Sequence, residues 1–155
     1  MEKILKLDQI TQIPSNRKLV LAGGVFDLLH YGHIKFLKEA KNCGDILIIA
    51  LESDANVQRR KGKDRPIHNQ QIRAEILSEL ACVDHVLILP IMENDQDYFE
   101  LVKTIKPAVV AITLNDPQQD NKRKQIESVG GKLKVVTDKI NTPSTSKLAQ
   151  ILKVE

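Results

Sequence analysis

The chain has 155 residues and a formal net charge of +3; 42% of its residues are hydrophobic and 28% are charged. This composition is typical of one compact domain with a buried core, which excludes a mainly disordered chain. Only 3% of the residues are aromatic and none is Trp, so a surface that stacks on bases is excluded too, and we expect no nucleic-acid partner.

Short apolar runs predict five strands, at residues 19–22, 45–51, 85–89, 108–112 and 133–136. Between and after them, apolar residues at helical spacing predict helices near residues 34–41, 72–80, 98–105, 126–129 and 143–152. Strands that alternate with crossover helices are typical of a parallel sheet with helices on both faces. The sequence therefore predicts an α/β fold, a doubly wound, Rossmann-like parallel sheet of about five strands.

The first 18 residues precede the predicted sheet. We expect residues 1–18 to be an N-terminal extension without a defined role, and residues 19–155 to form a single domain. The start of the chain lacks the continuous apolar core of a signal peptide, and no stretch is long and apolar enough to span a bilayer. Cys43 and Cys82 have no disulfide-framework spacing, so we expect reduced thiols, a cytoplasmic location and no membrane partner.

The turn after the first predicted strand carries the chemistry. It reads Gly-Gly-Val-Phe-Asp-Leu-Leu-His-Tyr-Gly-His at residues 23–33. His30 and His33 flank Gly32 at the start of a predicted helix, where unpaired N–H groups and positive potential attract anions. The missing side chain of Gly32 lets phosphate oxygens approach the backbone. The turn thus predicts a phosphate site in preference to two unrelated histidines or a zinc site, which would need a third ligand.

The string Gly-x-Phe-Asp-x-x-His-x-Gly-His resembles the signature of the cytidylyltransferase-like nucleotidyltransferases. The resemblance continues through residues 53–86 and is greatest to the adenylyltransferase part of ADP-heptose synthases. It implies the Rossmann-like fold of the HUP type and transfer of a nucleotidyl group, in which pyrophosphate leaves. It also implies a catalytic role for His30 and His33, as donors to the phosphates. The remaining turn residues are implied to bind the nucleotide: Gly24, Val25, Phe26, Asp27 and Gly32.

Three side chains in this half of the chain have both a functional and a structural interpretation. Asp27 could contact the metal of the nucleotide, orient a histidine, or form an Asx turn. Lys61 lies in the basic run 59–65, whose ordinary interpretation is a solvated loop. Arg73 lies among apolar helix positions, where its stem could simply pack against the core. The resemblance favours phosphate contacts, and thus catalytic roles, for Lys61 and Arg73.

The resemblance is weaker in the second half. Ser144, Thr145 and Ser146 lie at the start of the last predicted helix, where hydroxyls cap a helix or bind phosphate. Their likeness to the Ser-Thr-Thr segment of the family implies nucleotide binding. Residues 113–117 read Thr-Leu-Asn-Asp-Pro, where heptose-type relatives carry Lys-Gly-Gly-Asp. Only Asp116 is retained, and we expect it to bind nucleotide, whereas the rest of the change bears on which acceptor is used.

The resemblance therefore implies an enzyme that transfers a nucleoside monophosphate, with ATP as the expected donor, to a sugar 1-phosphate of the heptose kind. Mg²⁺ is expected to arrive with the triphosphate, because the sequence offers no carboxylate cage. A cytidylyltransferase that uses CTP and glycerol 3-phosphate is the alternative enzyme. A nucleotide-binding regulatory module is the alternative of another class, and a nucleic-acid binder would rest on the basic run alone. Relatives suggest a homodimer.

Overall fold

The computed structural model describes residues 2–137 and residues 147 and 150. Within this part of the chain, six strands form one parallel sheet in the order β1-β4-β3-β2-β5-β6. The strands are β1 (Ile4–Lys6), β2 (Leu19–Gly24), β3 (Ile46–Leu51), β4 (His85–Ile88), β5 (Val109–Thr113) and β6 (Lys132–Thr137). The helices are the 3-10 helix η1 (Leu7–Gln12), α1 (Tyr31–Lys41), α2 (Asp54–Lys61), α3 (Gln70–Ser78), α4 (Asp95–Ile105) and α5 (Gln119–Ser128). None of these described helices has the length and hydropathy needed to cross a membrane.

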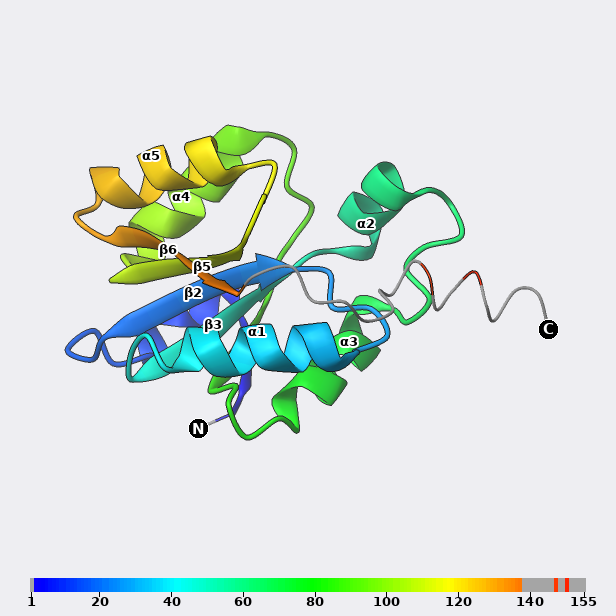
Figure 1. Cartoon of the computed structure of the whole chain (residues 1–155), viewed down its shortest axis with the longest axis horizontal. Helices are drawn as coiled ribbons and strands as arrows, with labels where there is room; N and C mark the ends of the chain where they lie inside the picture. Colours follow the sequence, from blue (N-terminus) through cyan, green and yellow to red (C-terminus); the bar gives the residue numbers. More distant parts are fainter. Residues whose placement is uncertain (1, 138–146, 148–149, 151–155) are drawn as a thin grey trace.

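Helices cover both faces of the sheet, so the predicted doubly wound α/β fold is confirmed. α1 and α3 lie on one face, and α4 and α5 lie on the other (Figure 1). From β2 onward the chain adds β3 and β4 on one side of β2, and then crosses to the opposite side with β5 and β6. The direction of winding therefore reverses between β2 and β5. In open α/β sheets, ligands bind beyond the carboxyl ends of the strands at such a reversal.

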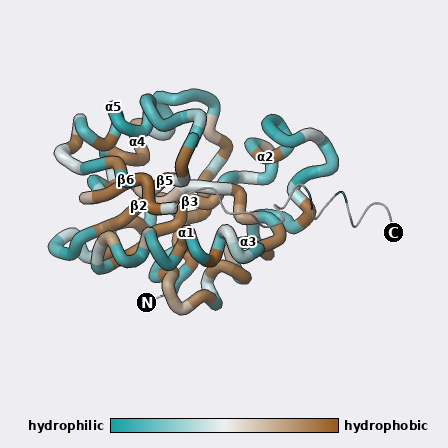
Figure 2. The backbone as a smooth tube through the Cα atoms, viewed as in Figure 1, coloured by the Kyte–Doolittle hydropathy of each residue, from teal (hydrophilic) through white to brown (hydrophobic). Residues whose placement is uncertain are grey.

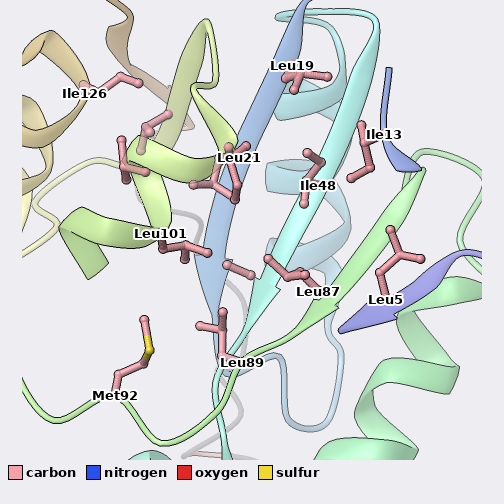
Figure 3. Packing of buried hydrophobic residues seen from close by; sticks show 14 of the residues in the cluster. Leu5, Ile13, Leu19, Leu21, Ile48, Leu87, Leu89, Met92, Leu101 and Ile126 are labelled. Carbon is pink, nitrogen blue, oxygen red and sulfur yellow. The ribbon is translucent and has the colours of Figure 1, made fainter. Parts of the chain in front are cut away.

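The central strands are buried on both faces, and this is why they appear in the sequence as continuous apolar runs. In β3, Ile48 packs in the core beneath α4 and α5 (Figure 3), whereas Leu47 and Ile49 pack in the core beneath α1 and α3. Figure 2 shows the same division, with hydrophobic strands at the centre and a largely hydrophilic α5 at the surface. The sheet is thus a rigid platform whose carboxyl edge presents the connecting loops.

The first 18 residues, predicted to be an extension without a defined role, contribute a strand to the sheet. β1 pairs in parallel with β4, with Ile4 opposite Val86 and Lys6 opposite Ile88. Leu5 is 1% exposed and packs in the same core as Ile13 (Figure 3). The sheet consequently has six strands instead of about five. A three-residue edge strand interrupted by lysine has no recognisable periodicity, which explains why it was not predicted.

The basic run was expected to be a loop, but its first residues form the last turn of α2. Ser53 caps this helix by accepting a hydrogen bond from the backbone N–H of Asn56, and Gly62 ends it with a φ of 98°. Asp54 in the first turn and the three basic residues in the last turn interact favourably with the helix dipole and stabilise the helix. The helix buries only Asn56 and Val57, so it has almost no apolar stripe that a sequence pattern would reveal.

Candidate active site

The two histidines of the turn lie face to face at the amino end of α1. Their ring centroids are 3.9 Å apart, and the ring planes are inclined by 31°. Nδ1 of His30 accepts a hydrogen bond from the backbone N–H of Gly32 at 3.1 Å. Nδ1 of His33 accepts one from the backbone N–H of His30 at 3.3 Å. The imidazoles thus form a reciprocal capping box, which fixes both rings over the start of the helix.

These hydrogen bonds also determine where the ring protons lie. Because each Nδ1 is an acceptor, the neutral ring must carry its proton on Nε2. Burial lowers the pKa of His33 to about 4, helped by the nearby charges of His30 and Lys61. Burial also lowers the pKa of His30. At neutral pH the pair therefore offers two Nε2–H donors beside the positive end of a helix dipole, an arrangement suited to phosphate oxygens.

The low pKa of His33 should make the stability of the fold depend on pH. An unfolded chain would bind a proton at His33 near the ordinary pKa of 6.5, whereas the native chain binds it only near 4. Because the unfolded chain takes up this proton first, the free energy of unfolding is highest above pH 6.5 as far as His33 is concerned. It decreases as the pH falls from 6.5 and decreases no further below about pH 4. We expect the thermal midpoint of His33→Gln to depend less on pH over this interval than that of the unmodified protein. If the thermal midpoints of the two proteins changed equally with pH between pH 4 and 7, this expectation would be contradicted.

The backbone before the histidines is held in an unusual conformation. Phe26 and Leu28 have φ values of 49° and 52°, in the left-handed region, where a residue with a side chain costs of order 1–3 kcal/mol. The buried Phe26 ring lies 5.4 Å from the ring of His33, measured between centroids. A Cβ at Gly24 would lie 2.7 Å from Cε2 of Phe26. Gly24 and Phe26 therefore stabilise the turn by close packing. Gly32 stabilises it by donating its N–H to His30.

Asp27 connects the turn to the segment before α3. Its carboxylate is buried and accepts hydrogen bonds from the backbone N–H groups of Ile67 at 2.7 Å and His68 at 3.1 Å. Nε of Arg65 lies 3.3 Å from the same carboxylate. These partners belong to the segment before α3, so the contacts of the Asp27 carboxylate are structural, and its contact with a nucleotide stays a prediction. It fastens that segment to the turn.

Arg73 differs from its predicted role. It is 1% exposed, and its guanidinium donates to the backbone carbonyls of Val25 at 2.8 Å, His68 at 2.9 Å and Glu52 at 3.0 Å. It also pairs with the Asp54 carboxylate at 2.7 Å. The expected phosphate contact is therefore replaced by internal contacts, because these carbonyls surround the guanidinium below the surface. The carbonyl of Val25 accepts one of these hydrogen bonds. Arg73 thereby connects three loops at the carboxyl edge of the sheet.

The structure describes two further predicted site residues, Lys61 and Asp116. Lys61 is exposed at the end of α2, and its charge acts on His33, so the two side chains belong to one electrostatic neighbourhood. Asp116 accepts from the backbone N–H of Gln118 at 2.7 Å and pairs with Lys122 at 2.6 Å. The predicted nucleotide-binding hydroxyls lie outside the residues that the structure describes: Ser144, Thr145 and Ser146.

A cavity of about 420 Å³ opens at the carboxyl ends of the strands, on the face covered by α4 and α5. Gly24 at the end of β2 and Asp116 after β5 line it, in agreement with the winding reversal between these strands. Glu52, Arg60 and Tyr98 line it as well, and sequence reasoning missed all three. Glu52 directly follows the apolar run of β3, and this position at the carboxyl end of a strand is the signal that could have found it.

Among the described residues, no group of three His, Cys, Asp or Glu side chains is arranged to hold a metal ion.

Comparison with known proteins places the chain among recognised relatives. A sequence model of the cytidylyltransferase-like family matches residues 21–151. "Bifunctional protein HldE" of Geobacter metallireducens is 38% identical over 97% of this chain and 31% of its own length. "Bifunctional protein HldE" of Helicobacter pylori is 41% identical over 70% of this chain and 23% of its own length. The chain thus spans about a third or less of these relatives.

Solved structures share the fold. The lipopolysaccharide core biosynthesis protein from Thermoplasma volcanium has a TM-score of 0.64 and 29% identity, and the match covers 82% of this chain and 99% of that one. The pantoate-beta-alanine ligase from Francisella tularensis also has a TM-score of 0.64, over 90% of this chain and 68% of that one. Its identity is 17%, so this second likeness concerns the fold alone.

Proposed function

Because the chain belongs to the cytidylyltransferase-like family, we propose that it is a nucleotidyltransferase in which His30 and His33 hold the phosphates of a nucleoside triphosphate. The observation that carries the proposal is the reciprocal capping of the two imidazoles, which turns both Nε2–H groups into fixed donors at the start of α1. A donor that is already oriented needs no reorganisation when negative charge develops during a reaction.

In the proposed reaction, a phosphate oxygen of the acceptor attacks the α-phosphorus of the triphosphate, and pyrophosphate leaves. Such a transfer requires positioning and charge neutralisation more than covalent chemistry by the protein. His30 and His33 would donate to the phosphoryl oxygens, and Lys61 would add positive charge. Mg²⁺ would enter as part of the triphosphate substrate. Ser144, Thr145 and Ser146 remain proposed nucleotide ligands on the strength of the sequence resemblance.

For the substrates we propose ATP and a sugar 1-phosphate of the heptose kind. The relatives named HldE and the likeness of residues 53–86 to ADP-heptose synthases support this choice. The similarity to the lipopolysaccharide core biosynthesis protein from Thermoplasma volcanium supports it as well. The cavity of about 420 Å³ at the winding reversal offers room for a sugar next to the carboxyl end of β2.

The proposal is tested by measuring pyrophosphate release with ATP or CTP against two acceptors, D-glycero-β-D-manno-heptose 1-phosphate and glycerol 3-phosphate. We expect release with ATP and the heptose 1-phosphate. Release only with CTP and glycerol 3-phosphate would favour the alternative enzyme. Thermal stabilisation by nucleotide without product from any pair would identify a regulatory module instead. Sedimentation of the same preparation tests the homodimer that the relatives suggest.

A further inference from the structure

The cavity holds a buried carboxylate for which the proposed phosphate chemistry has no use. Glu52 follows β3 and is 5% exposed. The hydroxyl of Tyr98, on α4, lies 2.9 Å from Oε1 and 3.0 Å from Oε2 of Glu52. Arg60, on α2, donates from Nη2 to the Tyr98 oxygen at 2.9 Å, and its Nη1 lies 3.6 Å from Oε1 of Glu52. Three different elements therefore converge on one carboxylate.

The direction of each hydrogen bond follows from the chemistry of the groups. A guanidinium can only donate, so the Tyr98 oxygen accepts from Arg60 and directs its own proton to Glu52. Burial and the adjacent Glu52 raise the pKa of Tyr98 to about 12, so the phenol keeps that proton at neutral pH. An ionised carboxylate has about four acceptor positions, and a single phenol proton fills one of them. Glu52 thus retains acceptor capacity inside a cavity.

The other residues that line the cavity indicate what kind of group would donate hydrogen bonds to Glu52. Two further carboxylates, Asp95 and Asp116, line the cavity, and Lys122 is paired with Asp116 at 2.6 Å. The carboxylates of the lining, Glu52, Asp95 and Asp116, outnumber its two cations, Arg60 and Lys122, so the cavity disfavours an anionic group, whereas hydroxyl groups donate to carboxylates favourably. Arg60 already balances the charge of Glu52, which favours a neutral donor over an ammonium group. The remaining lining includes apolar side chains that suit the carbon face of a ring: Leu21, Ala50, Leu89 and Leu101.

We propose that Glu52, oriented by Tyr98, is the specificity-determining residue for the acceptor, and that it accepts hydrogen bonds from the hydroxyls of a neutral sugar ring. The phosphate of the same acceptor remains outside the carboxylate-lined cavity and faces the histidines. This inference rests on the proposed nucleotidyltransferase function and adds to it the side chain that recognises the sugar hydroxyls of the acceptor. It disfavours acceptors that would bring a carboxylate or an amine into the cavity.

The test combines binding with kinetics in the full chain. The probes are D-glycero-β-D-manno-heptose 1-phosphate and phosphoethanolamine, measured by titration calorimetry in the presence of an unreactive α,β-methylene analogue of ATP. Glu52→Gln keeps the size of the side chain, and we expect it to weaken binding of the sugar phosphate by about tenfold or more. Tyr98→Phe leaves Glu52 unoriented, and a smaller loss is expected. In both variants, affinity for the nucleotide analogue should stay unchanged.

Glu100→Gln is the matched control, because it makes the same carboxylate-to-amide change on the exposed face of α4, where Glu100 pairs with Lys103. We expect no change in sugar phosphate binding. Glu52→Gln that binds the sugar phosphate within twofold of the unmodified protein would overturn the inference, as would tighter binding of phosphoethanolamine by the unmodified protein.

The two proposals fail in different ways. Binding of the sugar phosphate that depends on Glu52, with no pyrophosphate release under any condition, would support the inference and contradict the proposed function. Normal release with an unchanged KM for the sugar phosphate in Glu52→Gln would leave the proposed function intact and refute the inference.

Discussion

Replacing His30 with Asn is expected to slow pyrophosphate release by about 10²–10³-fold, the loss typical of one charge-stabilising donor, while the fold stays intact. The Nδ1 of His30 caps α1 by accepting from Gly32, and Asn is among the preferred residues for that capping role. The variant therefore keeps the cap but removes the Nε2–H donor. His30→Ala should lose the same activity and also about 0.5–2 kcal/mol of stability, because it removes the cap as well.

Comparison of the two His30 variants separates catalysis from folding. Turnover is measured with the best substrate pair, and the free energy of unfolding is measured by denaturant titration. His33→Ala should show a comparable loss of turnover, since its Nε2–H is the second donor of the pair. Near-normal turnover in His30→Asn would show that the imidazole acts only as a helix cap.

Replacing Arg73 with Met is expected to lower the free energy of unfolding by about 3–5 kcal/mol, because three backbone carbonyls lose a charged donor at about 1–3 kcal/mol each. The substitution removes the guanidinium donors to the carbonyls of Val25, Glu52 and His68. Arg73→Lys keeps the charge but supplies a point charge instead of a planar fork, so an intermediate loss is expected. Because Val25 belongs to the turn that carries the histidines, turnover should fall in both variants.

The matched control is Arg123→Met on the exposed surface of α5, where Nη1 of Arg123 lies 4.0 Å from Oε1 of Glu127. Its effect should lie within about 0.5 kcal/mol. A phosphate-binding arginine would give the opposite pattern, with lost activity at unchanged stability. Arg73→Met with an unfolding free energy within about 1 kcal/mol of the unmodified protein would therefore contradict the positioning role.

The fold was predictable where burial leaves a local pattern. β3 and β5 are continuous apolar runs because both of their faces are covered. Gly130 follows the helix predicted near residues 126–129, and its φ of 83° is the left-handed conformation that glycine adopts at a helix end without steric cost. β1 and α2 escaped prediction because their stability comes from an edge pairing and from caps, not from an apolar stripe. Such contributions appear only when distant segments are brought together.

The same contrast explains the site. The histidine pair was predictable because both residues, the glycine and the helix start lie within four positions of one another. Asp27 and Arg73 were assigned to the ligand, since nothing local reveals that their partners lie about 40 and up to 48 residues away. Glu52 and Tyr98 were missed for the same reason, being 46 residues apart. Side chains whose partners are distant in sequence need the fold before their role can be assigned.

In the proposed function, two neutral imidazoles donate from Nε2 to the phosphates of a bound nucleotide. The most direct measurement is a proton–nitrogen correlation spectrum of the histidine rings at pH 7, recorded while Mg²⁺ and ATP or CTP are added. We predict that His30 and His33 are both protonated at Nε2 before addition, and that saturating nucleotide shifts both Nε2 resonances. Protonation at Nδ1, or unchanged ring resonances at saturating nucleotide, would contradict it.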